Sequence, residues 1–310
     1  MSSINSTLTE PFNVYITTYN PTKRIKELVR QAEEYNSFGL PVTINLFIHN
    51  DYVLYPVVNE IHMLSTSGLE NIQFRVFYDS VQGFDFAWVH KTTRSLNASQ
   101  DVINNRETAI HIYQEDDCLI TKKAYMYWAR WYGTLSPLGL EPSFINYELY
   151  NGLKIPFDNH YVYSLLNKTP NVWGSLGYKV KTIAVDPRPD TQSDVEFFVQ
   201  VANPYYRACI MTASDVLNES FTPAGSREGS YSYVQNFRNW PVADRASMGL
   251  AFHNPPAGHD HRRCIPLVKH DLWFKPHDDC LLLHHGTKYS KQLDDSGVSL
   301  VTTDHMFSLC

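Results

Sequence analysis

The stretch at residues 108–121 constrains the fold most, because a mainly apolar run ends there in three consecutive acidic residues. Two isoleucines alternate with an alanine and a histidine in this run, which is typical of a strand with two unlike faces. Glu115, Asp116 and Asp117 follow, and three adjacent carboxylates repel one another unless a cation lies beside them. Hard oxygen ligands of this kind suit Mg²⁺ or Mn²⁺, which commonly bridge to substrate phosphates. A solvated acidic turn is the alternative interpretation.

Strands and helices alternate before this stretch. Alternating hydrophobic runs predict strands at residues 12–20, 42–48 and 74–78. Apolar residues at helical spacing predict a helix from about Thr22 that stops at Gly39, and a second helix includes residues 61–64. This order is typical of a doubly wound α/β fold with a mostly parallel sheet.

Ligands bind at the carboxyl ends of the strands in such a sheet. Thr18, Tyr19 and Asn20 end the first predicted strand, and Asp51 follows the second. We expect these residues to share one edge of the sheet with the three acids. The alternative is that each is only a turn residue, since Asn-Pro is an ordinary turn signal.

The Glu-Asp-Asp at a strand end resembles the acidic metal motif, the DxD class, of GT-A-fold glycosyltransferases. The resemblance implies a Rossmann-like, mostly parallel central sheet flanked by helices. It also implies a nucleotide-sugar-binding half at residues 1–121 and an acceptor-binding α/β half at residues 122–310 of the same catalytic domain.

The same resemblance implies roles for particular residues. Asp117 would bind Mn²⁺ or Mg²⁺, and Glu115 and Asp116 would support the donor ribose and the metal waters. The groups that would contact the donor nucleotide sugar are Thr18, Tyr19, Asn20, Asp51 and, at its phosphates or sugar, Lys91. A solvated helix face explains Lys91 equally well.

Residues 205–228 resemble the acceptor-side segment of the same family. We predict a strand, a short helix capped by Ser214, and then a turn that leads to Glu228. In inverting members of the family, an acid at this place deprotonates the acceptor hydroxyl. Arg227 stands where the family has a second acid, so a glutamate that merely stabilises a helix N-terminus is the alternative. Asp260 is the next candidate for the base.

The C-terminal third is rich in histidine, and residues 281–288 predict a short strand that leads into a glycine turn. The turn resembles one that returns a histidine to the metal in several GT-A families and places a lysine on the diphosphate. His284 or His285 would bind the metal, and Lys288, one residue earlier than in that pattern, would bind the donor. Imidazole is a good Mn²⁺ ligand, and the sequence does not separate the two histidines.

Composition excludes several classes of protein. The 310 residues carry a net charge of −6 without a block of Lys or Arg, which argues against nucleic acid as a partner. Neither a Gly-x-Gly-x-x-Gly after the first strand nor a Gly-Lys-Ser/Thr occurs, so dinucleotide and P-loop chemistry are not expected. Five widely spaced cysteines predict buried thiols. With no membrane span or signal peptide recognised, we expect a cytoplasmic protein, or a luminal Golgi or ER protein if the chain is a truncated catalytic domain.

The sequence therefore predicts a metal-dependent glycosyltransferase. It would move a sugar from a UDP-sugar, or alternatively a GDP-sugar, to a hydroxyl of a glycan or another acceptor, with inversion. A retaining transferase is one alternative. A sugar-nucleotide pyrophosphorylase is another, although residues 17–24 lack the Gly-rich basic loop of those enzymes. The third is a non-catalytic carbohydrate-binding protein.

Overall fold

The computed structural model describes residues 11–49, 59–60, 68–79, 89–156, 195–200, 207–220, 250–251, 253–259, 261–270, 273–286, 288–295 and 302–305. Asp51, Glu228, Asp260 and the helix predicted at residues 61–64 lie outside these residues. The chain forms two compact units, Met1–Lys122 with Arg207–His253 and Lys123–Tyr206 with Asn254–Cys310.

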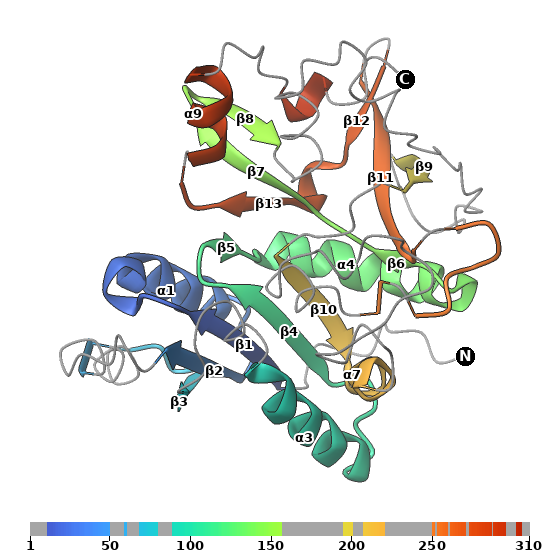
Figure 1. Cartoon of the computed structure of the whole chain (residues 1–310). Helices are drawn as coiled ribbons and strands as arrows, with labels where there is room; N and C mark the ends of the chain where they lie inside the picture. Colours follow the sequence, from blue (N-terminus) through green and yellow to red (C-terminus); the bar gives the residue numbers. More distant parts are fainter. Residues whose placement is uncertain are drawn as a thin grey trace. The chain divides into compact units, whose positions relative to one another are not determined.

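A five-stranded sheet forms the centre of the first unit, with the strand order β10-β4-β1-β2-β3 (Figure 1). Its strands are β1 (Phe12–Thr18), β2 (Val42–His49), β3 (Ile72–Asp79), β4 (Ile110–Glu115) and β10 (Ala208–Thr212). The first four strands are parallel to one another, and β10 runs antiparallel to β4. The predicted mostly parallel sheet and its first three strands are confirmed within a mixed α/β protein.

Helix α1 (Pro21–Asn36) follows β1 directly, as predicted. The Asn20 side chain accepts a hydrogen bond from the Lys23 backbone N–H, and Pro21 occupies the first turn, so both residues favour the helix start. Leu28, Ala32 and Tyr35 lie at helical spacing and are buried. Their face of α1 packs against the sheet.

Helices cover the sheet of the first unit on both faces (Figure 1). Helix α1 lies on one face, where the Tyr35 hydroxyl donates to the Gln114 side chain of β4 at 2.5 Å. Helices α3 (His90–Ile103) and α7 (Ala213–Ser220) lie on the other. Tyr15 and Tyr113 point toward that second face and belong to its hydrophobic core. Tyr113 and Gln114 are consecutive residues of β4, so their side chains point to opposite faces of the sheet.

The start of α7 corrects one prediction. Thr212, rather than Ser214, caps the helix: the Asp215 N–H donates to Thr212 Oγ1, and the Thr212 N–H donates to Asp215 Oδ2, each at 3.1 Å. This reciprocal pair is a capping box with an aspartate in the third helical position. Ser214 is the second residue of the helix.

The second unit contains shorter strands in two groups. Strand β11 (Arg263–His270) pairs with β6 (Glu141–Pro142), β9 (Val195–Val199) and β12 (Trp273–Pro276). Strand β7 (Ile145–Tyr150) pairs with β8 (Leu153–Pro156) and β13 (Leu281–His284). The helical segments are α4 (Lys122–Leu135), α9 (Lys288–Asp295) and the short turns Ser136–Leu138, Asp278–Cys280 and Thr303–His305. The strand predicted within residues 281–288 is present as β13.

Aromatic packing fixes α4 in the second unit. The Trp131 ring meets Phe198 of β9 at 5.0 Å, edge to face, and the Tyr127 hydroxyl donates to the Ser143 carbonyl at 2.9 Å. The cysteines within the described ranges are buried thiols outside disulfide bonds, namely Cys118, Cys209, Cys264 and Cys280. Across those ranges we find no helix with the length and apolar character needed to cross a membrane.

Candidate active site at the carboxyl ends of β1 and β4

The three acids lie where the strand order of the first sheet reverses. The chain builds β2 and β3 on one side of β1 and β4 on the other, so the reversal falls between β1 and β4. The carboxyl ends of the strands at such a point form the usual ligand crevice of an open α/β sheet. Thr17 of β1 is level with Glu115 of β4, and Thr18 Oγ1 donates to Asp116 Oδ2 at 2.6 Å. The structure thus brings together Thr18 and the acids, as predicted.

Arg24 reaches the acids from the first turns of α1. Its Nη2 atom lies 3.0 Å from Asp117 Oδ2, and its Nε atom lies 3.6 Å from Asp116 Oδ1. The Arg24 side chain is only partly exposed, at 32%. One guanidinium group therefore spans two carboxylates.

Arg207 reaches the acids from the start of β10. Its Nη1 atom lies 2.9 Å from Glu115 Oε2 and 3.9 Å from Asp117 Oδ1, and its carbonyl accepts from the Glu115 N–H at 3.0 Å. The Arg207 backbone has φ = +55°, a left-handed conformation that costs energy for a residue with a side chain. The surrounding contacts hold this strained residue against the acids.

A buried amide supports the acidic turn from behind. Gln31 of α1 is fully buried, and its Nε2 atom donates to the carbonyls of Asp116 at 3.0 Å and Cys118 at 2.8 Å. The Gln114 Nε2 atom donates to the same Cys118 carbonyl at 3.2 Å. These buried side-chain amides give the backbone carbonyls of the turn hydrogen-bond partners, which stabilises the turn that carries the carboxylates.

Burial raises the pKa of Asp116 to about 7, and the negative charge of Asp117 beside it acts in the same direction. The hydrogen bond from Thr18 and the positive charge of Arg24 oppose that shift without cancelling it. The positive charge of Arg24 therefore does not fully compensate the burial of Asp116 and the charge of Asp117. A further cation or a proton would stabilise the site.

The cations that the structure places beside the acids are arginines. Within the described part of the chain, no three His, Cys, Asp or Glu side chains converge in a way that could hold a metal ion. Asp116 and Asp117 nevertheless offer two adjacent carboxylates. Mg²⁺ is usually held by one or two carboxylates and completes its coordination with water and substrate phosphates, so this donor set fits a metal that arrives with a phosphate ligand.

The other predicted donor-site residues of the first unit have local roles. The Tyr19 ring, 46% exposed, lies 4.7 Å from the His49 ring at the end of β2. Asn20 caps α1, as described above. Lys91 lies in the first turn of α3, directly after the buried His90, and its contact with a donor stays a prediction.

The predicted C-terminal ligands lie in the second unit. His284 ends β13 and is buried, with its Nδ1 atom 3.2 Å from Oε1 of the fully buried Glu148. The other Glu148 oxygen, Oε2, accepts from the Ser290 N–H in the first turn of α9 at 2.7 Å. His285 is half-buried, and Lys288 is exposed at the start of α9. Metal and diphosphate binding by these residues stay predictions.

Two residues of the acidic cluster were not foreseen from the sequence. Arg24 occupies an ordinary position on an amphipathic helix, and Arg207, about 90 residues after the acids, lies in the segment that was interpreted as acceptor-side. One signal was present for Arg207: a strand that pairs antiparallel with an acidic strand begins near the acidic end, so the residue just before it lies beside the acids.

No protein-family model and no curated protein matches the chain. The crystal structure of S. aureus TarS, residues 1–349, is similar to it with a TM-score of 0.25 and 13% sequence identity, over 44% of this chain and 35% of that chain. A likeness at this level carries no argument about fold or function.

Proposed function

We propose that the chain is a glycosyltransferase of the GT-A type that takes a nucleoside-diphosphate sugar, a UDP-sugar first and a GDP-sugar second, together with Mn²⁺ or Mg²⁺. One observation carries the proposal: Asp116 and Asp117 stand at the strand-order reversal, with Thr18 and two guanidinium groups against them. A site with alternating carboxylates and guanidinium groups can take both a cation and a polyanion.

Arg24 and Arg207 support a diphosphate ligand. A guanidinium group pairs with phosphate oxygens as well as with carboxylates, and its planar donors suit either. A metal bound by Asp117 would neutralise charge that develops on the leaving diphosphate. In this proposal the two arginines orient the diphosphate, and Thr18 holds Asp116 so that its carboxylate faces the same ligand.

The transfer step needs a base if the reaction inverts the anomeric centre. We propose Glu228 for that role and Asp260 as the next candidate, on the resemblance described above. The base would take the proton from the acceptor hydroxyl while that oxygen bonds to the anomeric carbon and the carbon–diphosphate bond breaks. A retaining transferase would not need this residue.

The other candidate functions have less support. A sugar-nucleotide pyrophosphorylase also has strands in this order of sequence, but Tyr19 to Arg24 form a capped helix start without a Gly-rich loop. A non-catalytic carbohydrate-binding protein would not require adjacent carboxylates paired with two guanidinium groups at the reversal point.

A thermal-shift screen of nucleoside diphosphates, each with and without Mn²⁺, tests the proposal. A ligand at 100 times its dissociation constant adds about 2.7 kcal/mol to the free energy of unfolding. We expect UDP or GDP to raise the melting temperature only when Mn²⁺ is present. If no nucleoside diphosphate stabilises the protein in the presence of Mn²⁺, the proposal is wrong.

A further inference from the structure

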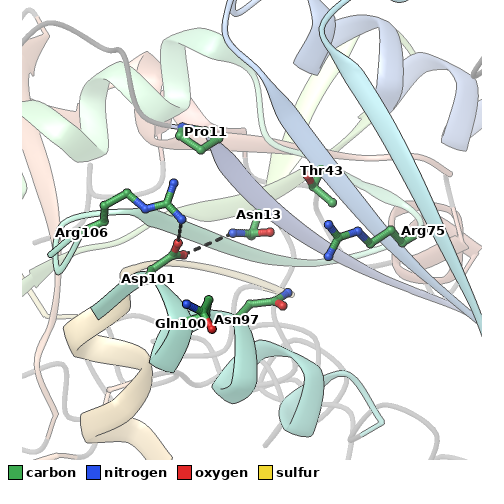
Figure 2. Close-up of a pocket in the computed structure, with 8 residues that line it drawn as sticks. All are labelled: Pro11, Asn13, Thr43, Arg75, Asn97, Gln100, Asp101 and Arg106. Carbon is green, nitrogen blue, oxygen red and sulfur yellow. Dashed lines mark hydrogen bonds and ion pairs between the residues drawn. The ribbon is translucent and has the colours of Figure 1, made fainter. Parts of the chain in front are cut away.

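A second polar pocket lies in the first unit, at the opposite end of the sheet strands from the acids. It has a volume of about 200 Å³ and lies between the first residues of β1 and β2 and the second half of α3 (Figure 2). Asn13 is the second residue of β1, and Thr18 is the last. Five residues of strand span about 16 Å, so this pocket is separate from the proposed donor site.

One wall of the pocket is fixed by a chain of buried hydrogen bonds. His111 Nε2 lies 3.0 Å from Asp101 Oδ2, and His111 Nδ1 lies 3.0 Å from the Tyr15 hydroxyl. The Asn97 side-chain amide donates to the same hydroxyl at 3.0 Å. Burial lowers the pKa of His111, which favours the neutral ring.

In a neutral imidazole one ring nitrogen donates and the other accepts, which determines the donor and the acceptor in each of these hydrogen bonds. His111 Nε2–H donates to Asp101, Nδ1 accepts from the Tyr15 hydroxyl, and that hydroxyl accepts from Asn97, so each group finds a partner. Asn97 and Asp101 lie one turn apart on α3, and both line the pocket. The wall is therefore held in one geometry before any ligand arrives.

Two guanidinium groups point into the pocket from opposite sides (Figure 2). Arg106 pairs with Asp101, whose other oxygen also accepts from the Asn13 amide at 3.4 Å. Arg75 of β3 forms no hydrogen bond or ion pair with another described residue, and its side chain is exposed. Since Asp101 balances only one arginine, the lining that the structure describes carries a net positive charge.

We propose that this pocket binds a small ligand through an anionic group, a phosphate or a carboxylate. Arg75 would supply the charge and a planar pair of donors, and the Arg106 guanidinium, with the side-chain amides of Gln100 and Asn97, would complete the polar contacts. The volume suits a small metabolite or the anionic end of a larger one. This site is independent of the proposed transfer reaction.

Titration of the full chain with inorganic phosphate, and separately with malonate, tests this site. Side-chain amide NMR signals of Asn13, Asn97 and Gln100 report binding in the pocket rather than at Arg24. We expect saturable shifts in these signals with at least one of the two probes. Phosphate alone would identify a phosphate site, malonate alone a carboxylate site, and no shift with either would overturn the proposal.

Arg75→Gln is the matched variant, because it removes the charge without breaking an ion pair that the structure shows. We expect about tenfold weaker binding or more. Arg30→Gln, an exposed arginine on α1, is the control for a loss of charge in the same unit, and it should bind as wild type does. Equal binding by Arg75→Gln and wild type would contradict the assignment. Asp117→Asn should leave this titration unchanged, which separates the pocket from the proposed donor site.

Discussion

Thr18 Oγ1 donates a 2.6 Å hydrogen bond to Asp116 Oδ2, which joins the last residue of β1 to the acidic turn after β4. The two residues are 98 positions apart in the sequence. They meet because β1 and β4 are neighbouring parallel strands whose carboxyl ends share one edge. The contact therefore holds polar side chains from both strands together at the point where the strand order reverses.

Asp116→Asn should stabilise the protein above neutral pH. The pKa of Asp116 is raised from 3.8 to about 7, so the folded protein holds this proton more tightly than the unfolded chain does. The resulting stabilisation is complete below pH 3.8 and is lost as the pH rises through about 7. The asparagine has no charge to ionise, so its free energy of unfolding at pH 8 should exceed that of wild type.

Urea denaturation between pH 4 and pH 8 measures this difference, which we expect to shrink toward the acidic end. Glu107→Gln, an exposed acid on the same unit, is the control and should follow the wild-type profile. A variant that is less stable than wild type at every pH would mean that the acids are not electrostatically strained.

His90→Phe should reduce the loss of stability in acid. His90 is fully buried and its ring stacks on Tyr113 at 4.1 Å, and neither ring nitrogen finds a hydrogen-bond partner in the ranges that the structure describes. Burial lowers its pKa well below 6.5. The unfolded chain therefore takes up a proton below pH 6.5 that the folded protein does not, and stability falls as the pH drops.

Chemical denaturation from pH 7 to pH 5 checks this prediction. The phenylalanine variant should lose less stability over that range than wild type does. His270→Phe, a half-buried histidine of the second unit, is the comparison. Parallel profiles for wild type and His90→Phe would show that His90 takes up its proton without unfolding.

Glu148→Gln should destabilise the second unit. Glu148 is fully buried, and its two oxygens accept from the Ser290 N–H and contact His284. The amide keeps the size but loses the charge and offers a donor where an acceptor is needed, which costs about 1–3 kcal/mol. Urea denaturation measures the cost, with the exposed Glu70→Gln as the control.

Substitutions of the two histidines at the end of β13, His284 and His285, should then differ in their effect on stability. His284→Ala leaves the Glu148 carboxylate without its neighbouring imidazole and should lower the unfolding free energy, whereas His285→Ala should change it little. The same pair of variants, compared for Mn²⁺ dependence of nucleotide binding, separates a metal ligand from a structural histidine. Equal stability of both variants and wild type would contradict the role assigned to the His284–Glu148 contact.

The alternating strands and helices of the first unit were predictable, because the apolar residues of each element repeat at strand or helix spacing and turn or capping residues mark its ends. The run from Phe12 to Thr18 alternates along a strand, and Asn20 and Pro21 begin the next helix. Ser214 was the wrong cap because Thr and Ser both occur near the helix start, and only the geometry shows that Thr212 bonds to Asp215.

The partners of the acids were less predictable for a physical reason. The sequence shows that three carboxylates need positive charge, but it does not show which distant arginine supplies it. Arg24 looks like part of a solvated helix face, and Arg207 depends on the pairing of β10 with β4, a contact between residues far apart in the chain. The Tyr15–His111–Asp101 chain is hidden for the same reason.

Glu228→Gln tests the proposed base. The variant keeps the shape and removes the basicity, so metal-dependent nucleotide binding should stay intact while turnover falls by about 10²–10⁴-fold. NMR of the product should show an inverted anomeric configuration. A retained configuration, or near-normal turnover by the variant, would remove Glu228 from the mechanism, and Asp260→Asn would be the next comparison.

Calorimetric titration of UDP and GDP into wild type and Asp117→Asn, each with Mn²⁺ and with a chelator, tests the central claim most directly. A metal shared between Asp117 and the diphosphate couples the two ligands, and such coupling commonly changes affinity by about 5- to 150-fold. We predict that Mn²⁺ strengthens binding of one nucleotide to wild type by a factor in this range, and that Asp117→Asn loses the increase while Glu107→Gln keeps it. Binding that ignores Mn²⁺, or an increase that Asp117→Asn retains, would contradict the account.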